Sequence, residues 1–490
     1  MRFSLLKDLL TLPLLYLGFR ALDNLIVMSL LLILTLAVTS LYSEDDDDEE
    51  EKSKESGKDA SSKKEGGASH RHGSHHELLD KFYGFRRKYT TVYLVIMLAD
   101  WMQGTHMYTL YMSYGVNISA LFLTGFLSGG IFAPFLGSFV DKFGRKRSCI
   151  IYCLLEIAIN VMEGYQNFTI LLLGRIMGGV STNLLFSAFE SWMTTEHRRQ
   201  GFPEEWLSRT YSMCSIINGT TAILAGIVAQ LLEDAFGHIG PFHGAVGLTS
   251  LALLLILGWE ENYGEESVGE HNNSSLVHQF MEGWRHTISD SRIWRIGLTQ
   301  ALSEGAMYTF VFMWVPTLLS LEPPGGVPTG CVFSSLMMSI TMGGLCYPAL
   351  QGFIRSYLSS KETSAELCAS FVYFLAAASM GIPVLCLSSY FSGTEQCTDL
   401  VLVSFLVVEF CVGLFMPVAG TLRSKYVPDA LQGAILNIFR LPLNAIVVSG
   451  TYATDVLEPS VVFTAVSGCF LAASLLQATM IPQSTKAKTD

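Results

Sequence analysis

Apolar stretches of about 20 residues recur along almost the whole chain, separated by short polar segments. A helix of this length crosses the ~30 Å hydrocarbon core of a bilayer. We count thirteen such stretches, and the first, near 22–42, stands apart from the others. The remaining twelve follow closely on one another: 90–113, 118–140, 148–164, 168–194, 209–232, 241–259, 293–320, 330–354, 366–390, 399–421, 432–455 and 459–481.

Composition agrees with this pattern. Half of the residues are hydrophobic and 15% are charged, whereas soluble domains carry about 25% charged residues. The stretches are continuously apolar and do not alternate as the strands of a membrane β-barrel do. We therefore expect an all-α membrane protein with two six-helix halves and one additional N-terminal transmembrane helix.

The longest polar break among the twelve stretches divides them six and six. The predicted segments are an N-terminal segment with the extra helix (1–42), an acidic and His-rich linker (43–88), the first half (89–259), an inter-half loop (260–292), the second half (293–482) and a tail (483–490). The linker is rich in charge and poor in apolar residues, which predicts disorder.

Lys and Arg gather in alternate loops of the twelve-helix core. These residues are Lys142, Arg145, Lys146, Arg147, Arg198, Arg199, Arg209, Arg355, Lys361, Arg423 and Lys425, and the intervening loops have none. By the positive-inside rule, the basic loops, the linker, the inter-half loop and the tail face the cytosol. The flanks of the first helix give conflicting signs, so its orientation, and a role as signal anchor, stay open.

The two halves share an internal repeat. GGIFAPFLGSF at 129–139 parallels GGLCYPALQGF at 343–353, and MYT at 107–109 parallels MYT at 307–309. Transporters built from two such halves bind substrate near the bilayer midplane and expose it alternately to each side.

A glycine-rich basic motif, GSFVDKFGRKR, joins the second and third stretches. It resembles the signature of the major facilitator superfamily at Gly137, Asp141, Gly144, Arg145, Lys146 and Arg147. The resemblance implies that these residues latch the cytosolic face in one conformation. A plain basic loop that only sets topology is the alternative.

Five further segments resemble the molybdate-anion transporter family of this superfamily. They are ADWMQG (99–104), GRIMGGVSTNLLFSAFESW (174–192), WEENYG (259–264), QALSEGAMYTFVFMWVP (300–316) and LNIFRLPLN (436–444). The resemblance extends from about 89 to 481 and implies uptake of molybdate for molybdenum cofactor synthesis. A carrier of another anion, such as sulfate or a small organic acid, and a transport-inactive receptor or scaffold are the alternatives.

Two arginines within apolar stretches, Arg440 and Arg175, are the candidate anion ligands. Charges at such depth cost about 2.5–3.5 kcal/mol on translocon scales and usually face a cavity or one another. The guanidinium fork suits a tetrahedral oxyanion, and Pro442 frees a backbone carbonyl beside Arg440. The alternative for Arg440 is a salt bridge with Glu304 or Glu409, and for Arg175 a part in the conformational switch.

Four carboxylates are candidate coupling or cavity groups: Glu304, Asp100, Glu190 and Glu409. The membrane potential of a negative cell opposes entry of a dianion by ~2.3 kcal/mol per charge per 100 mV. Co-import of more than two protons would make the transport cycle electrically favourable. Pairing with arginines is the alternative for Glu304 and Asp100. Glu190 lies near the end of its stretch, and a structural role is the alternative for Glu409.

Other chemistry finds no support in the sequence. The chain has no GxxxxGK[ST] motif, which argues against ATP as the energy source, and nothing indicates nucleic-acid binding, a cofactor or catalysis. The tract HRHGSHHE at 70–77 has no fixed ligand spacing, so we expect a solvated linker and no metal site. The expected partners are molybdate, co-transported protons and the lipid bilayer, and the expected location is the plasma membrane, with an endomembrane as the alternative.

Overall fold

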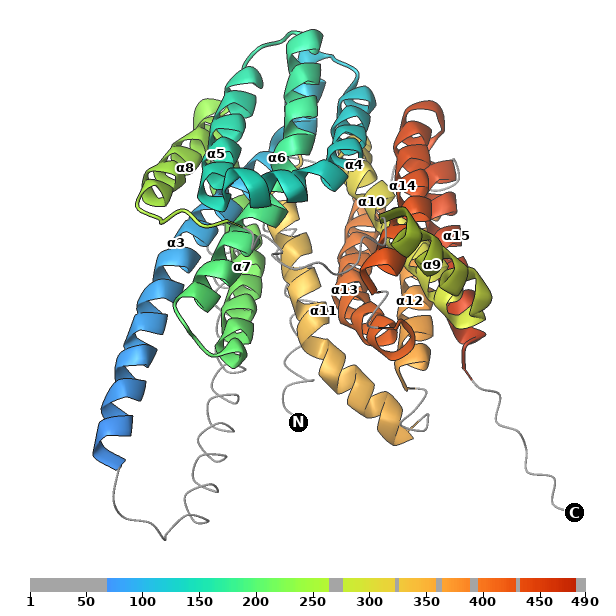
Figure 1. Ribbon diagram of the computed structural model, residues 1–490. Coiled ribbons are helices and arrows are strands. Elements are labelled where there is room, and N and C mark those ends of the chain that lie inside the picture. The colour runs from blue at the N-terminus through green and yellow to red at the C-terminus, as the bar shows by residue number, and fades with distance from the viewer. Residues whose placement is uncertain are drawn as a thin grey trace, which may run out of the picture. The chain divides into compact units, whose positions relative to one another are not determined.

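The computed structural model describes residues 68–263, 276–321, 326–357, 364–387, 395–428 and 432–481, which form helices and short connections. The helices, coloured along the chain in Figure 1, are α3 (Ala68–Tyr114), α4 (Ile118–Phe143), α5 (Arg145–Met162), α6 (Phe168–Arg199), α7 (Glu204–Phe236), α8 (Gly240–Leu257), α9 (Leu276–Ser289), α10 (Ser291–Ser320), α11 (Thr329–Tyr357), α12 (Ser364–Cys386), α13 (Glu395–Tyr426), α14 (Gln432–Val456) and α15 (Pro459–Ala478). The predicted helix near 22–42, the acidic run 44–51 and the tail 483–490 lie outside the described residues.

Each of the twelve predicted stretches overlaps one of these helices. Seven helices in the described part of the chain are long and apolar enough to cross a membrane: α6, α7, α8, α11, α12, α13 and α15. The helices that contain Asp100, Glu156, Glu304 and Arg440 are not among the seven. The all-helical class of membrane protein is thus confirmed, and the arrangement of twelve helices plus one remains a prediction.

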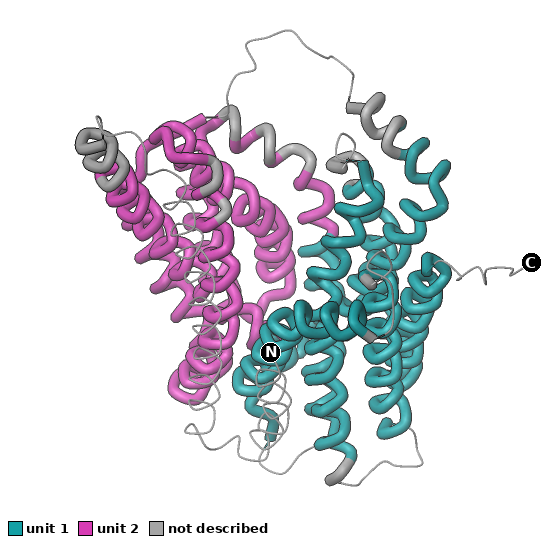
Figure 2. The backbone as a smooth tube through the Cα atoms, turned by 90° about the horizontal axis from the view of Figure 1, so that it is seen from below, with its two compact units in different colours: residues 1–16, 111–126, 267–490 teal, residues 17–110, 127–266 magenta. Residues whose placement is uncertain are grey.

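The described residues cluster into two compact units (Figure 2). Residues 68–110 and 127–263 lie in one unit, called here the N-terminal unit, and residues 111–126 lie with the described part of 276–481 in the other, the C-terminal unit.

The structure differs from the expected disordered linker at the linker's end, because α3 begins at Ala68. From there the helix presents an apolar face with a spacing of three and four residues, at Phe82, Phe85 and Tyr89. The Phe82 ring packs on Trp206 at 5.0 Å between centroids. This burial favours helix where composition alone predicts disorder. In the described part of the predicted inter-half loop, α9 is likewise helical.

The internal repeat makes a corresponding helix contact in each unit. In the N-terminal unit a Cβ built on Gly129 of α4 would lie 3.7 Å from the Gly179 carbonyl oxygen of α6. In the C-terminal unit one built on Gly343 of α11 would overlap the Phe410 carbonyl and lie 3.1 Å from the Cα of Gly413 in α13. Small residues let membrane helices approach closely. The repeated GG sequence therefore marks equivalent crossings.

Candidate substrate and coupling sites

A polar stripe follows one face of α10 in the C-terminal unit. Gln300, Glu304 and Tyr308 are four residues apart, so their side chains lie along the same face. Arg423, from the last turns of α13, donates from Nη1 to Gln300 Oε1 at 2.9 Å. The Glu304 side chain lies one turn from Gln300 on this face, and the charges of Arg423 and Arg440 act on it.

Close packing of α14 on α10 positions Arg440 beside this stripe. The Phe439 ring covers Gly297, and Ile446 covers Gly305, so any Cβ at either glycine would clash. The Arg440 side chain is exposed, and its charge acts on both Glu304 and Tyr308. The ion pairs of the described residues do not join Arg440 to Glu304 or Glu409.

Arg175 has a different setting, in a buried ion pair. Its Nη2 lies 2.5 Å from Oε1 of Glu163, and the two side chains are 12% and 1% exposed. Arg175 Nη1 also contacts the Met107 sulfur at 2.9 Å. Glu163 caps the C-terminal end of α5, so the pair joins the end of α5 to the early turns of α6.

Asp100 belongs to a polar cluster in the N-terminal unit. Its carboxylate lies within electrostatic range of Glu156 and close to Gln103. Gln103 Nε2 donates to Glu156 Oε2 at 3.0 Å, and Glu156 also accepts from Ser181 and, at 3.4 Å, from Asn160. Two carboxyl groups from α3 and α5 thus share one network.

The other two predicted carboxylates lie outside these clusters. Glu190 is exposed on α6 and accepts from the Tyr211 hydroxyl of α7 at 3.1 Å. Glu409 on α13 is only 3% exposed, and its Oε2 makes no hydrogen bond within the described part of the chain.

The basic end of the signature motif is held by the segment that follows α8. Glu261 accepts from the backbone N–H groups of Lys146 at 2.8 Å and Arg147 at 3.2 Å, which satisfies unpaired donors at the start of α5. Gly144 precedes them with φ +106°, and a Cβ there would lie 2.7 Å from the Glu261 carboxyl carbon. Both facts require glycine at 144.

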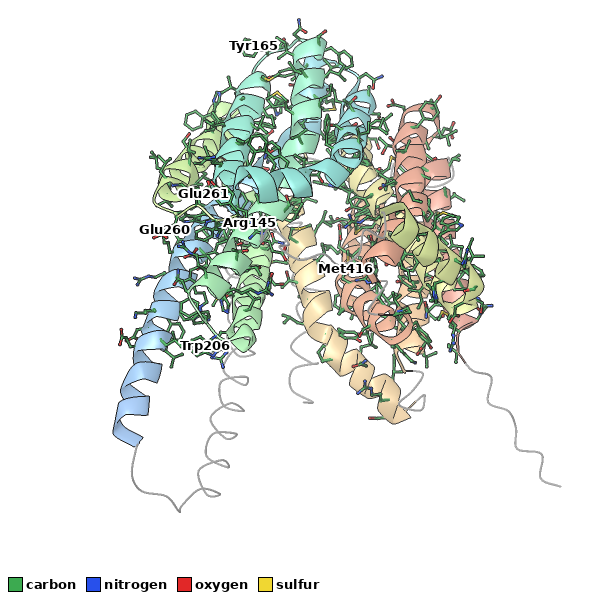
Figure 3. The ribbon with its side chains drawn as sticks, in the orientation of Figure 1. Arg145, Tyr165, Trp206, Glu260, Glu261 and Met416 are labelled. Carbon is green, nitrogen blue, oxygen red and sulfur yellow. The ribbon has the colours of Figure 1, made fainter. Side chains whose placement is uncertain are left out.

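The same segment is fixed to the end of α6. Trp192 and Trp259 stack with 3.8 Å between ring centroids, and Trp192 Nε1 donates to the Glu260 carbonyl at 2.8 Å. Asn262 accepts from the Arg145 N–H at 3.0 Å. Figure 3 labels Arg145, Glu260 and Glu261 in this region. The surroundings of the other two motif residues, Gly137 and Asp141, lie outside what the structure describes.

Sequence reasoning did not select several residues of these clusters: Gln103, Glu163, Gln300, Tyr308 and, as a site residue, Arg423. The four-residue spacing of Gln300, Glu304 and Tyr308 was a usable signal. Arg423 and Glu163 had none, because their partners lie on other helices.

Comparison with known proteins agrees with this architecture. A family described as sugar transporters with 12 transmembrane segments matches residues 68–408. The molybdate-anion transporter of Xenopus tropicalis is 33% identical over 384 residues, which cover 74% of this chain and 77% of that protein. That of Danio rerio is 30% identical over 397 residues, covering 76% and 79%.

Solved structures share the fold. The nucleoside transporter NupG is similar with a TM-score of 0.62 at 12% identity, covering 81% of this chain and 99% of its own. A peptide transporter solved in complex with sulfate has a TM-score of 0.58 at 13% identity, covering 80% and 94%.

Helices of membrane-spanning character, the repeated halves and this shared architecture define a multi-pass membrane transporter of the major facilitator superfamily, not an enzyme. Within that superfamily, the chain belongs to the molybdate-anion transporter family.

Proposed function

We propose that this protein imports molybdate across the plasma membrane by alternating access, with protons carried inward alongside the anion. The observation that carries the proposal is Arg440. It is an arginine within an apolar helix whose exposed guanidinium acts on Glu304 without an ion pair between them among the described residues. The names of the relatives supply the substrate.

The two arginines take different roles in this proposal. Arg175 is already neutralised by Glu163, and a second anion would have to compete with a carboxylate that is almost fully buried. Arg440 keeps donors for an incoming oxyanion, and five N–H groups in a planar fork suit tetrahedral oxygens. We therefore assign anion contact to Arg440 and helix joining to Arg175.

Glu304 is the first coupling candidate. The charges of Arg423 and Arg440 both act on its carboxyl group. A dianion bound at Arg440 offsets the positive charge that acts on Glu304. This change favours the protonated form of the Glu304 carboxyl. Anion binding and proton binding would then support each other, as co-transport requires.

Asp100 is the second coupling candidate. The charge of Glu156 acts on it, and Gln103 beside it donates to Glu156. Like charges at short range repel strongly in a medium of low dielectric constant, so a proton relieves the pair. Protons carried at these two sites would offset the cost of moving a dianion against the membrane potential, which is ~2.3 kcal/mol per charge per 100 mV.

The first test is uptake of radiolabelled molybdate into proteoliposomes that contain the full chain. An inward proton gradient should raise the initial rate, and excess sulfate should leave most of it. Block by sulfate at equal concentration would instead indicate a general oxyanion carrier.

A receptor or scaffold is distinguished by deleting residues 43–67, which precede α3. A carrier keeps its uptake after this deletion, whereas a scaffold that signals through the acidic segment loses its partner and shows no uptake before or after.

A further inference from the structure

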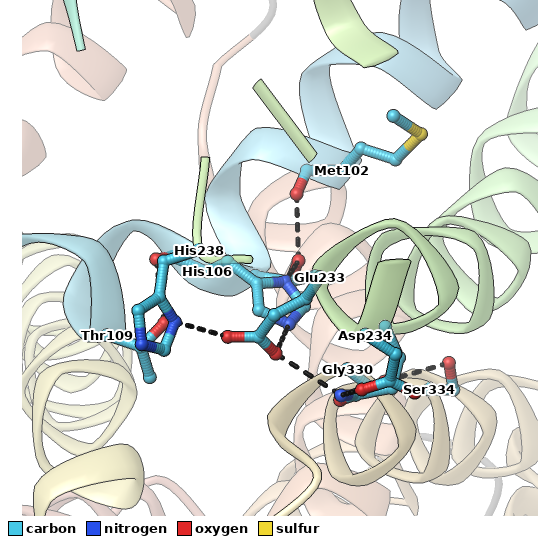
Figure 4. Close-up of polar contacts among 10 residues, drawn as sticks. Met102, His106, Thr109, Glu233, Asp234, His238, Gly330 and Ser334 are labelled. Carbon is cyan, nitrogen blue, oxygen red and sulfur yellow. Dashed lines mark hydrogen bonds and ion pairs between the residues drawn. The ribbon is translucent and has the colours of Figure 1, made fainter. Parts of the chain in front are cut away.

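Two histidines meet one glutamate at the end of the N-terminal unit that is opposite the basic loop at 145–147. His106 Nε2 on α3 lies 2.8 Å from Oε2 of Glu233 on α7. The other carboxylate oxygen, Oε1, lies 2.6 Å from Nδ1 of His238, just beyond α7. Figure 4 shows Glu233 between the two imidazole rings.

Solvent exposure increases along the row formed by His106, Glu233 and His238. The His106 side chain has 0% exposure, Glu233 has 14% and His238 has 50%. A buried imidazole is thus connected to water through a carboxylate and a second, half-exposed imidazole. No part of the proposed anion or coupling sites uses these residues.

Neighbouring hydrogen bonds assign the hydrogens of His106. The Thr105 hydroxyl donates to the Met102 carbonyl at 2.8 Å. A hydroxyl has one hydrogen, so Thr105 Oγ1 accepts at its 2.6 Å contact with His106 Nδ1. Nδ1 therefore carries a hydrogen in this network.

That assignment leaves Nε2 facing a carboxylate oxygen at 2.8 Å. Neutral imidazole protonated at Nδ1 and an ionised carboxylate would place two acceptors in contact. Nε2 makes no hydrogen bond there among the described residues, so the 2.8 Å separation is that of an ion pair, in which an imidazolium is attracted to a carboxylate. Such a pair carries no net charge.

The other charged groups nearby are paired with one another or exposed, so the proton belongs to His106, Glu233 and His238. On α7, Gln230 donates to Glu233 at 3.2 Å and to Asp234 at 3.0 Å. On α6, Arg175 contacts Met107, the neighbour of His106, but is paired with Glu163 of α5. His243 on α8 is exposed. The imidazoles of His106 and His238 are the basic groups that act on Glu233 among the described residues.

The same two helices also share an apolar contact. Met102, Ala225 and Ala229 form a buried cluster of α3 and α7, with Leu232 packed against it. The His106 side chain has no exposed surface of its own, so His238 is the member of the group that meets solvent most directly.

We propose that His106, Glu233 and His238 form a proton-binding site that opens to water at His238 and joins α3 to α7 only while it is loaded. This deepens the proposed function by placing a proton site apart from Glu304 and Asp100. Its existence does not depend on the identity of the transported anion.

Thermal unfolding of the purified full chain between pH 6 and pH 8 tests the site directly. A folded state that binds an extra proton loses stability as pH rises. The unfolding midpoint of wild type should fall relative to Glu233→Gln by about 1–2 °C over this interval, given the unfolding entropy of a chain of this length. His243→Gln, which changes an exposed histidine outside the row, should keep the wild-type slope. Parallel profiles for wild type and Glu233→Gln would overturn the proposal.

His238→Gln provides the second variant, because a half-exposed side chain outside the helix can change without loss of folding. It should shift the external pH of half-maximal molybdate uptake, with the maximal rate unchanged. An unshifted profile contradicts the proposal. Absence of uptake by wild type together with the predicted unfolding slope would reject molybdate transport and leave the proton site standing. Normal uptake with parallel unfolding profiles would support molybdate transport and reject the proton site.

Discussion

Nη2 of Arg175 lies 2.5 Å from Oε1 of Glu163, and this pair connects α6 to the cap of α5. Both side chains are largely removed from solvent. Removing one partner from such a pair leaves an uncompensated charge and typically costs 3–5 kcal/mol, whereas replacing both by apolar residues is often neutral.

Arg175→Gln and Glu163→Leu should therefore each lower the unfolding free energy by about 3–5 kcal/mol. The double variant Arg175→Met/Glu163→Leu should recover most of the loss, because neither charge is then left alone. Denaturant unfolding in detergent measures this cycle. If Arg175→Gln is stable and loses only its affinity for molybdate, Arg175 contacts the anion and the structural role is wrong.

Glu261 at the start of α5 gives a second prediction. Glu261→Ala removes the acceptor of two backbone N–H groups, and loss of such a cap costs about 0.5–2 kcal/mol. Gly144→Ala should also destabilise, since the residue has φ +106° and its Cβ would meet the Glu261 carboxyl. Thermal unfolding of both variants checks this.

The matched control is Glu260→Ala, one residue away. Glu260 is paired with Arg199 at the surface, where ion pairs contribute little. The hydrogen bond and charge of Arg199 lower the pKa of Glu260, so any stabilisation is present above the usual carboxyl range and is lost on acidification through the lowered value. An equal effect of Glu260→Ala and Glu261→Ala near neutral pH would contradict the capping role.

Glu304→Gln should uncouple transport from the proton gradient. The amide cannot take up a proton, yet it keeps a polar group beside Arg440. Uptake driven by the gradient should fall at least tenfold, while exchange of internal for external molybdate continues. Glu409→Gln is the control, because Glu409 is buried on α13 and makes no ion pair with Arg423 or Arg440 among the described residues, and this variant should keep its response to the gradient. The opposite pattern would assign coupling to Glu409.

Much of the fold was predictable because it follows from apolar length and local repeats. Every predicted core stretch overlaps a helix, and the GG repeat marks corresponding helix crossings. The helical residues from Ala68 to Lys88 were not predictable from composition, because their apolar face is stabilised by Trp206 and Phe202, far along the chain.

The candidate site was predictable only in part. The cost of a charge in an apolar helix identifies Arg440, Arg175 and Glu304 as unusual residues. The partners that distinguish their roles, Glu163 and Arg423, come from other helices, and only tertiary packing brings them together. The basic motif was recognisable, but its dependence on Glu261 was not, since 115 residues separate Glu261 from Lys146.

Gradient-driven uptake of radiolabelled molybdate by wild-type and Arg440→Gln proteoliposomes is the most direct test of the central claim. Equal amounts of folded protein in each preparation are established first by unfolding profiles. Wild type should take up molybdate and the variant should lose at least tenfold, with Arg440→Lys intermediate because a point charge replaces the planar fork. Uptake by Arg440→Gln at the wild-type rate would contradict it.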